Sequence, residues 1–118
     1  MIEMQLTEAE AAVINERRRQ QAPCGGYASV QGEGYGAWHD DQHDRGELAI
    51  AAACYAAGST FEREDTHPKA SRTITRRLWP WDMDWWKPTT PRRNLVKAAA
   101  LCIAEIERLD RAAAKEGE

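Results

Sequence analysis

The chain has little of what several classes of protein require. Its 118 residues include three cysteines, with no CxxC pair, and the formal net charge is −3. An odd number of widely spaced cysteines speaks against a disulfide framework. The negative charge speaks against general nucleic-acid binding, which normally needs a basic excess.

Long apolar runs are also missing. No stretch is long enough to span a bilayer, and the first residues lack the basic start and apolar run of a signal peptide. We therefore expect a cytoplasmic protein with no membrane partner. No segment alternates cleanly with a period of two, so little or no sheet is expected.

The apolar residues that are present make up 42% of the chain, and many of them are alanine. A single compact domain is expected, with a thin core in which the five tryptophans supply much of the volume. A homo-oligomer would help to bury what one copy cannot.

Helical signals cover most of the chain and predict an all-α, mainly helical fold. Thr7 and Glu10 form a capping box, and Gly58 is a candidate stop for the central helix. The expected segments of the single domain 1–118 are a helix over 7–21, a glycine-rich loop over 22–38, a central alanine-rich helix over 39–57, a loop with a tryptophan-rich segment over 58–90, and a long C-terminal helix over 91–115.

The C-terminal helix has the clearest pattern. Thr90 is a good N-cap and Pro91 suits the first helical position. Apolar residues then recur at steps of 4, 3, 4, 3 and 4, a row expected to pack on the central helix or on a second subunit. The row consists of Leu95, Ala99, Cys102, Ile106, Leu109 and Ala113.

An acidic segment rich in histidine lies at the start of the central helix. In a continuous helix His39, His43 and Glu47 would share one face, with Asp40 and Asp44 in the adjacent row. So many carboxylates predict a positive partner: a metal ion, arginines from elsewhere or a basic ligand group. The alternative is an acidic helix start that complements the helix dipole.

Two kinds of partner can be named for this segment. Asp40, Asp44 and Glu47 could hold magnesium or another divalent metal, with His39 or His43 as general base. Alternatively, one of the three arginines at 17–19, in the polar half of the first helix, could turn inward to meet the acidic cluster or an anion. These arginines could equally form a solvated helix end.

The tryptophan-rich segment is the second candidate site. Aromatic rings stack on bases and basic side chains hold phosphates, so the combination predicts a nucleotide pocket. The alternative is that the tryptophans are core residues. The candidates are Trp79, Trp81, Trp85, Trp86, Arg76, Arg77, Lys87, Arg92 and Arg93.

A third acidic group lies on the C-terminal helix, where Glu107 and Asp110 form an ExxD pattern. Asp44 and Glu47 offer a DxxE partner, and paired carboxylate motifs on neighbouring helices can hold magnesium. Glu107 also stands four residues before Arg111, which is the spacing of an ordinary surface ion pair.

In their order along the chain, these motifs resemble a small family of phage and prophage accessory proteins, mostly without assigned function. The shared motifs are Glu16 to Gln20, His39 to Ala56, Trp79 to Pro88 and Leu95 to Arg111. The family is distantly similar to MazG-like all-α nucleotide pyrophosphohydrolases. The first motif is histidine-rich here, and the gap to Glu107 is longer than in the ExxE and ExxD pattern of those enzymes.

Three functions follow from the residues and the resemblance. The favoured one is binding of a phosphorylated nucleotide or nucleotide-derived signal, sequestered to counter host defence. In this function, one face of the acidic segment contacts the sugar or the base of the nucleotide, or holds a metal. That face consists of His39, Asp40, His43 and Glu47. The alternatives are a magnesium-dependent nucleotide phosphohydrolase and an inhibitor that binds a host defence protein through the tryptophan loop.

Overall fold

The structure is a computed structural model that describes residues 5–21, 37–61, 75 and 77–117, with the backbone alone for 37–39 and 59–61. In chain order, its elements are α1 (Glu8–Gln21), α2 (Ala37–Gln42), α3 (Glu47–Phe61), the 3₁₀ turn η1 (Met83–Trp85) and α5 (Pro91–Glu116). Within these ranges there is no strand, and the all-α prediction is confirmed. The glycine-rich segment, Cys24 and Arg76 lie outside the described residues.

The capping box at the start of α1 is present as predicted. The Thr7 amide donates to Glu10 Oε1 at 3.0 Å, and the Glu10 amide donates to Thr7 Oγ1 at 3.1 Å. These two bonds satisfy backbone donors that the first helical turn would leave unpaired.

The prediction of one central helix over 39–57 is wrong. The chain leaves α2 after Gln42, turns, and enters α3 at Glu47. Gly46 has φ of 84°, a conformation that glycine adopts without the steric cost of a Cβ. The Glu47 carboxylate accepts from the Arg45 amide at 2.6 Å and closes the turn. His39, His43 and Glu47 therefore do not form one row on one helix.

The predicted end of the central helix at Gly58 is also wrong, since α3 continues to Phe61. A glycine inside a helix costs about 1 kcal/mol relative to alanine. That cost is small beside the packing of α3 along α5. Gly58 is buried, and a Cβ there would lie 3.5 Å from the Trp86 ring.

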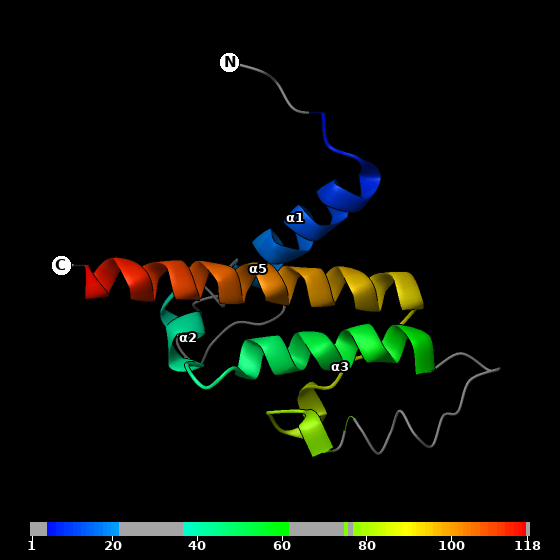
Figure 1. Cartoon of the computed structure of the whole chain (residues 1–118). Coiled ribbons are helices and arrows are strands. Elements are labelled where there is room, and N and C mark those ends of the chain that lie inside the picture. The colour runs from blue at the N-terminus through cyan, green and yellow to red at the C-terminus, as the bar shows by residue number, and fades with distance from the viewer. Residues whose placement is uncertain (1–4, 22–36, 62–74, 76, 118) are drawn as a thin grey trace.

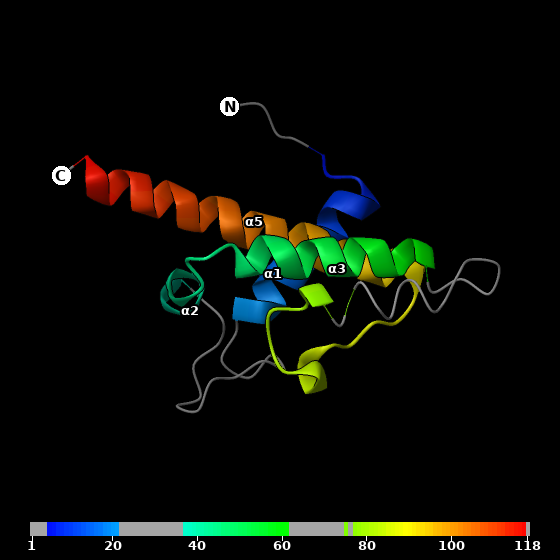
Figure 2. The ribbon, with the colours of Figure 1, turned by 60° about the horizontal axis from the view of Figure 1, so that its bottom comes forward.

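Helices α3 and α5 lie side by side and run in opposite directions (Figure 1). Alanine side chains let the two backbones approach closely, and Ala51 and Ala100 are fully buried. Turning the molecule shows α1 crossing α5 at an angle and α2 beside the C-terminal half of α5 (Figure 2). The buried cluster contains Ala51, Ala52, Cys54, Tyr55, Trp79 and Ala98.

The tryptophan-rich segment forms a loop with one short turn, as predicted. Trp79 is buried, and its indole Nε1 donates to the Asp82 carbonyl at 3.0 Å. Trp81 and Trp86 pack against the core cluster, while Trp85 is 46% exposed. The segment thus supplies core volume and also an accessible ring.

Helix α5 begins where predicted and ends one residue later than predicted. Thr90 Oγ1 accepts from the Arg93 amide at 3.1 Å as the N-cap. The apolar row from Leu95 to Ala113, however, does not pack on α3. The buried side of α5 instead carries Asn94, Val96, Lys97, Ala98, Ala100 and Ala104.

Among the described residues, none of the helices is both long and apolar enough to cross a membrane.

Candidate functional site

A cavity of about 500 Å³ lies where α1, α2, α3, α5 and the tryptophan loop meet. The acidic segment and the tryptophan loop, which are far apart in sequence, both contribute to it. Its lining consists of Arg17, Gln20, Asp40, Gln42, His43, Leu48, Tyr55, Trp79, Trp81, Asp82, Trp85, Lys97, Leu101 and Ala104.

One wall of the cavity is aromatic. The rings of Tyr55 and Trp79 meet edge to face, with centroids 5.6 Å apart, and those of Trp79 and Trp81 do so at 5.3 Å. Trp86 packs behind Tyr55 at 4.7 Å and does not line the cavity. Rings that brace one another in this way give the wall a fixed shape.

Arg17 and Asp40 bring opposite charges together in the polar part of the cavity. Arg17 Nη2 lies 2.7 Å from Asp40 Oδ2, and both side chains are almost completely buried. Burial raises the pKa of the Asp40 carboxyl above its ordinary value, although Arg17 and Arg111 lower it. Arg17 also contacts the half-exposed Glu107, with its Nε 3.1 Å from Oε1. Of the two outcomes left open for the arginines at 17–19, Arg17 shows the inward one, with its contact to the acidic cluster.

Lys97 is the second cation that lines the cavity, and it is 6% exposed. Its Nζ donates to the Lys87 carbonyl at 2.6 Å and lies 5.4 Å from the centre of the Tyr55 ring. Burial lowers the pKa of Lys97, and the charge of Arg93 lowers it further. An ammonium group has three N–H donors, so this lysine retains the capacity to bind a ligand.

A buried ion cluster supports this polar end from α1. The Glu16 side chain is fully buried and pairs with Arg19 at 2.8 Å and with Arg93 of α5. Gln20 donates to Glu16 Oε2 at 3.0 Å and also lines the cavity. The cluster therefore connects the position of α1 to the shape of the cavity.

His43 lines the cavity from the turn between α2 and α3. Its ring centroid is 5.0 Å from that of Trp81, and Nδ1 lies 3.5 Å from Glu47 Oε2. Glu47 does not line the cavity. Burial raises the pKa of Glu47, but the amides of Glu47 and Arg45 and the nearby His43 together lower it below its ordinary value.

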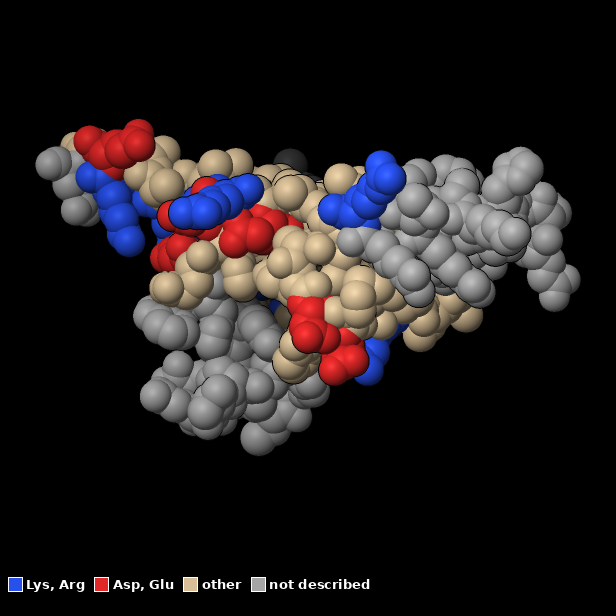
Figure 3. All heavy atoms as spheres, turned by 90° about the horizontal axis from the view of Figure 1, so that it is seen from below, with Lys and Arg blue, Asp and Glu red and all other residues tan. Residues whose placement is uncertain are grey.

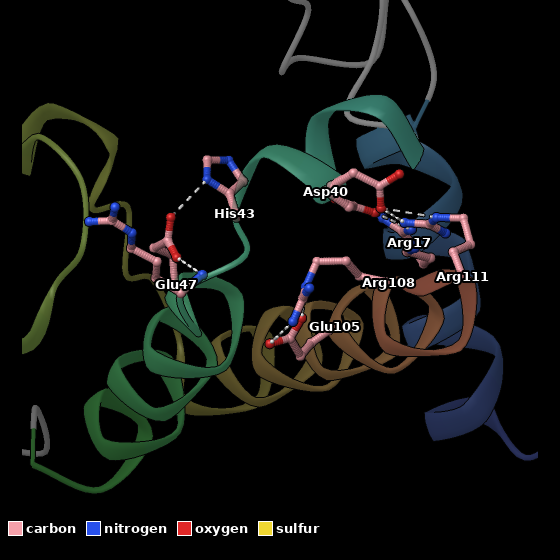
Figure 4. Close-up of polar contacts among 9 residues, drawn as sticks. Arg17, Asp40, His43, Glu47, Glu105, Arg108 and Arg111 are labelled. Atoms are coloured by element: carbon pink, nitrogen blue, oxygen red, sulfur yellow. Dashed lines mark hydrogen bonds and ion pairs between the residues drawn. The ribbon is translucent and has the colours of Figure 1, made fainter. Parts of the chain in front are cut away.

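The predicted metal ligands point to different partners. Asp40 faces Arg17, Asp44 is exposed, and Glu47 faces His43 (Figure 4). Within the described ranges no three His, Cys, Asp or Glu side chains are arranged to hold a metal ion. The side chain of His39 lies outside the described residues. On α5, Glu105 pairs with Arg108 at 2.5 Å, and Glu107 faces Arg17.

The basic residues predicted to hold phosphate are placed elsewhere. Arg77, Lys87 and Arg92 are exposed, Arg93 pairs with Glu16, and none of these four lines the cavity. The sequence interpretation missed Gln20, Tyr55 and Lys97. Lys97 had a signal, since it interrupts the apolar run from Leu95 to Leu101. Tyr55 was hidden in the apolar part of the central helix.

The face of the molecule drawn in Figure 3 is mixed in charge. In Figure 3, groups of acidic and basic side chains lie next to one another, with uncharged surface between them. On the described part of this face, neither sign forms a continuous field.

Searches with this chain found no matching family model, no matching curated protein and no matching solved structure.

Proposed function

We propose that the cavity binds a phosphorylated nucleotide or a nucleotide-derived signalling molecule. The base would lie against Trp81 and Trp85, and the phosphate would face Lys97 and Arg17. His43 and Asp40, which also line the cavity, would hydrogen-bond to the base or the sugar.

The size and the aromatic wall of the cavity support this ligand class. Small-molecule sites commonly enclose about 300–1,000 Å³ and combine apolar walls with a few polar groups. The volume of about 500 Å³ suits one nucleotide. Aromatic faces stack on flat heterocycles, each stacked base contributing about 1–3 kcal/mol.

Lys97 carries the argument for an anionic group. It is a buried cation whose hydrogen-bond acceptor at 2.6 Å is a neutral carbonyl. Burying a charge without an opposite charge is costly. Glu16 partly offsets that cost, but Arg93 and Arg19 add to it. A phosphate in the cavity would supply the missing negative charge and form a charge-assisted hydrogen bond.

The form of the function that we propose is sequestration. Hydrolysis by a bound metal would need carboxylates that converge on the cavity. Asp40 is instead held by Arg17, and Asp82 Oδ1 accepts from the Asp84 amide at 2.8 Å. On the basis of the resemblance to phage accessory proteins, the proposed ligand is a host defence signal that this protein retains in the host cytoplasm.

The first test is native mass spectrometry of the protein purified from its host, followed by denaturation and analysis of the released molecules. An intact nucleotide among them is the expected result. Titration of tryptophan fluorescence with a panel of nucleotides would then give affinities.

Matched variants show whether the cavity is responsible. Lys97→Met should weaken nucleotide binding at least about tenfold, or about 1.4 kcal/mol. Lys115→Met makes the same change at an exposed position of the same helix and should have no effect. Equal affinities of both variants and the original chain would contradict the proposal.

A second candidate function is inhibition of a host protein. The observation in its favour is that Leu78, Met83 and Trp85 are 49%, 43% and 46% exposed on the tryptophan segment. Exposed aromatic and thioether groups are typical interface anchors. A co-purifying protein that is lost on Met83→Ala, with no released nucleotide, would favour this candidate.

A further inference from the structure

The side of α5 that faces solvent is apolar along most of its length. Leu95, Ile106 and Leu109 are 51%, 57% and 52% exposed, and Cys102 is exposed between them. Together with Ala99 and Ala113 they form the row with steps of 4, 3, 4, 3 and 4. At 100° per residue, these six side chains fall within one narrow stripe.

The buried side of the same helix has the opposite character. It carries Lys97, Asn94 and small alanines such as Ala100 and Ala104. A helix that packs on a single core normally turns its largest apolar side chains inward. In α5, Leu95, Ile106 and Leu109 point outward, so the helix has a second apolar face that the described part of the chain leaves uncovered.

The spacing of the stripe indicates what covers it. Apolar residues that alternate at steps of three and four are typical of a helix that packs lengthwise against another helix. From residue 95 to residue 113 the stripe is free of charged residues and extends about 27 Å along the axis. A flexible peptide or a small ligand has no need of such a regular row.

We propose that α5 packs antiparallel against α5 of a second copy of this chain. This register places Leu95 opposite Ala113 of the partner subunit, and Ala99 opposite Leu109 of the partner subunit. At the centre, Cys102 faces Ile106 of the partner subunit. Each layer then pairs a small side chain with a large one, which fills the interface evenly.

The parallel arrangement fills space less well. It would place Ala99 opposite Ala99 of the partner subunit, and Ala113 opposite Ala113 of the partner subunit. Both of these layers would contain only small side chains. Either pair has two-fold symmetry, so the same surface of both subunits is buried and none is left to extend the assembly. The pairing of small with large side chains is therefore what favours the antiparallel arrangement.

The other described helices leave room for this contact. In Figures 1 and 2, α3 lies along one side of α5 and α1 crosses it on another. The cavity residues Lys97, Leu101 and Ala104 are on the inner side of α5. The dimer contact and the cavity therefore use different faces, and each can be tested without the other.

Sedimentation velocity of the full chain over a range of concentrations tests the proposal. The original chain should sediment as a dimer, and Ile106→Glu should halve the mass by placing a carboxylate in the central layer. Leu78→Glu is the matched control, because it changes a similarly exposed apolar residue away from the stripe. It should remain dimeric.

Two results would overturn the proposal. One is a monomeric original chain at every concentration, which needs no variant to interpret. The other is a dimer that Ile106→Glu leaves intact. Circular dichroism would show that the variants keep their helices, as expected for an exposed position.

Cross-linking tests the register in a background with Cys24→Ala and Cys102→Ala. A mixture of Leu95→Cys and Ala113→Cys chains should form a disulfide-linked pair that contains one of each. Cross-linking of Leu95→Cys chains with one another would show the parallel arrangement and contradict the antiparallel one.

Discussion

Helix α5 is held by two contacts of opposite chemistry. Against α3 it packs small apolar side chains such as Ala51 and Ala98, with Tyr55 and Trp79 next to them. Against α1 the buried residues are Glu16, Arg17 and Gln20, all polar. One contact is stabilised by close packing and the other by ion pairs that only a particular arrangement of helices satisfies.

The two contacts have different effects on the fold: the alanine contact stabilises it, and the ionic contact positions its helices. The alanine contact buries apolar surface without directional bonds, so it favours proximity of α3 and α5. The ionic contact is satisfied only when Glu16 meets Arg93 and Arg17 meets Asp40. Buried ion pairs contribute little net stability but are costly to break. We infer that they position α1 and α2 around the cavity.

The largest expected effect comes from breaking the ionic contact. Glu16→Ala removes the fully buried carboxylate that pairs with Arg19 and Arg93. Loss of one member of a buried pair costs about 3–5 kcal/mol. Because both arginines are more than one-third exposed, we expect about 2–3 kcal/mol. Urea denaturation measures it, and a loss below about 0.5 kcal/mol would place this contact among ordinary surface pairs.

The alanine contact should respond to an increase in volume. Ala51→Leu inserts three carbons at a fully buried position and should lower the free energy of unfolding by about 1–3 kcal/mol. Ala53→Leu makes the same change on the exposed side of α3 and should cost less than about 0.5 kcal/mol. Equal effects in thermal denaturation would show that α3 and α5 are not closely packed.

Of the two contacts, only the ionic contact should change its contribution to stability as the pH falls. Burial raises the pKa of Glu16, but the hydrogen bonds and charges of Arg19 and Arg93 together lower it below the ordinary value of 4.5. The unfolded chain therefore binds this proton at higher pH, and Glu16 contributes less stability as the pH falls below 4.5. Asp40 acts in the opposite direction, because burial raises its pKa in the fold.

Two variants separate these contributions in denaturation curves recorded between neutral and acid pH. Glu16→Gln should make the loss of stability in acid shallower. Asp40→Asn should make it steeper, because it removes the group that gains stability there. Identical slopes for both variants would show that other carboxylates dominate.

Much of the fold could be predicted from local sequence signals. The Thr7 and Glu10 capping box, the Thr90 cap and the apolar steps of α5 act within a few residues, so helix positions follow from them. The break at Gly46 was missed because both a helix and a positive φ are open to glycine. Whether the chain continued as a helix or turned at Gly46 depended on where α2 and α3 pack against α5.

The site was less predictable than the helices. Histidines, carboxylates and tryptophans drew attention because of their chemistry, and His43, Asp40, Trp79, Trp81 and Trp85 do line the cavity. The predicted phosphate contacts Lys87, Arg92 and Arg93 do not line it. Proximity to the tryptophans along the chain could not show on which side of the loop or helix each cation lies.

The sequence alone was enough for the helical class, for the N-terminal caps at Thr7 and Thr90, and for the inward arginine as one of two outcomes for residues 17–19. Those features depend on interactions between residues a few positions apart or on the need of buried carboxylates for a partner. It was helix packing that decided that Arg17 meets Asp40, that Lys97 lines the cavity, and that Leu95 and Leu109 of α5 point outward. Each of these depends on how helices distant in sequence are rotated about their axes, and that rotation is set by packing along their full length.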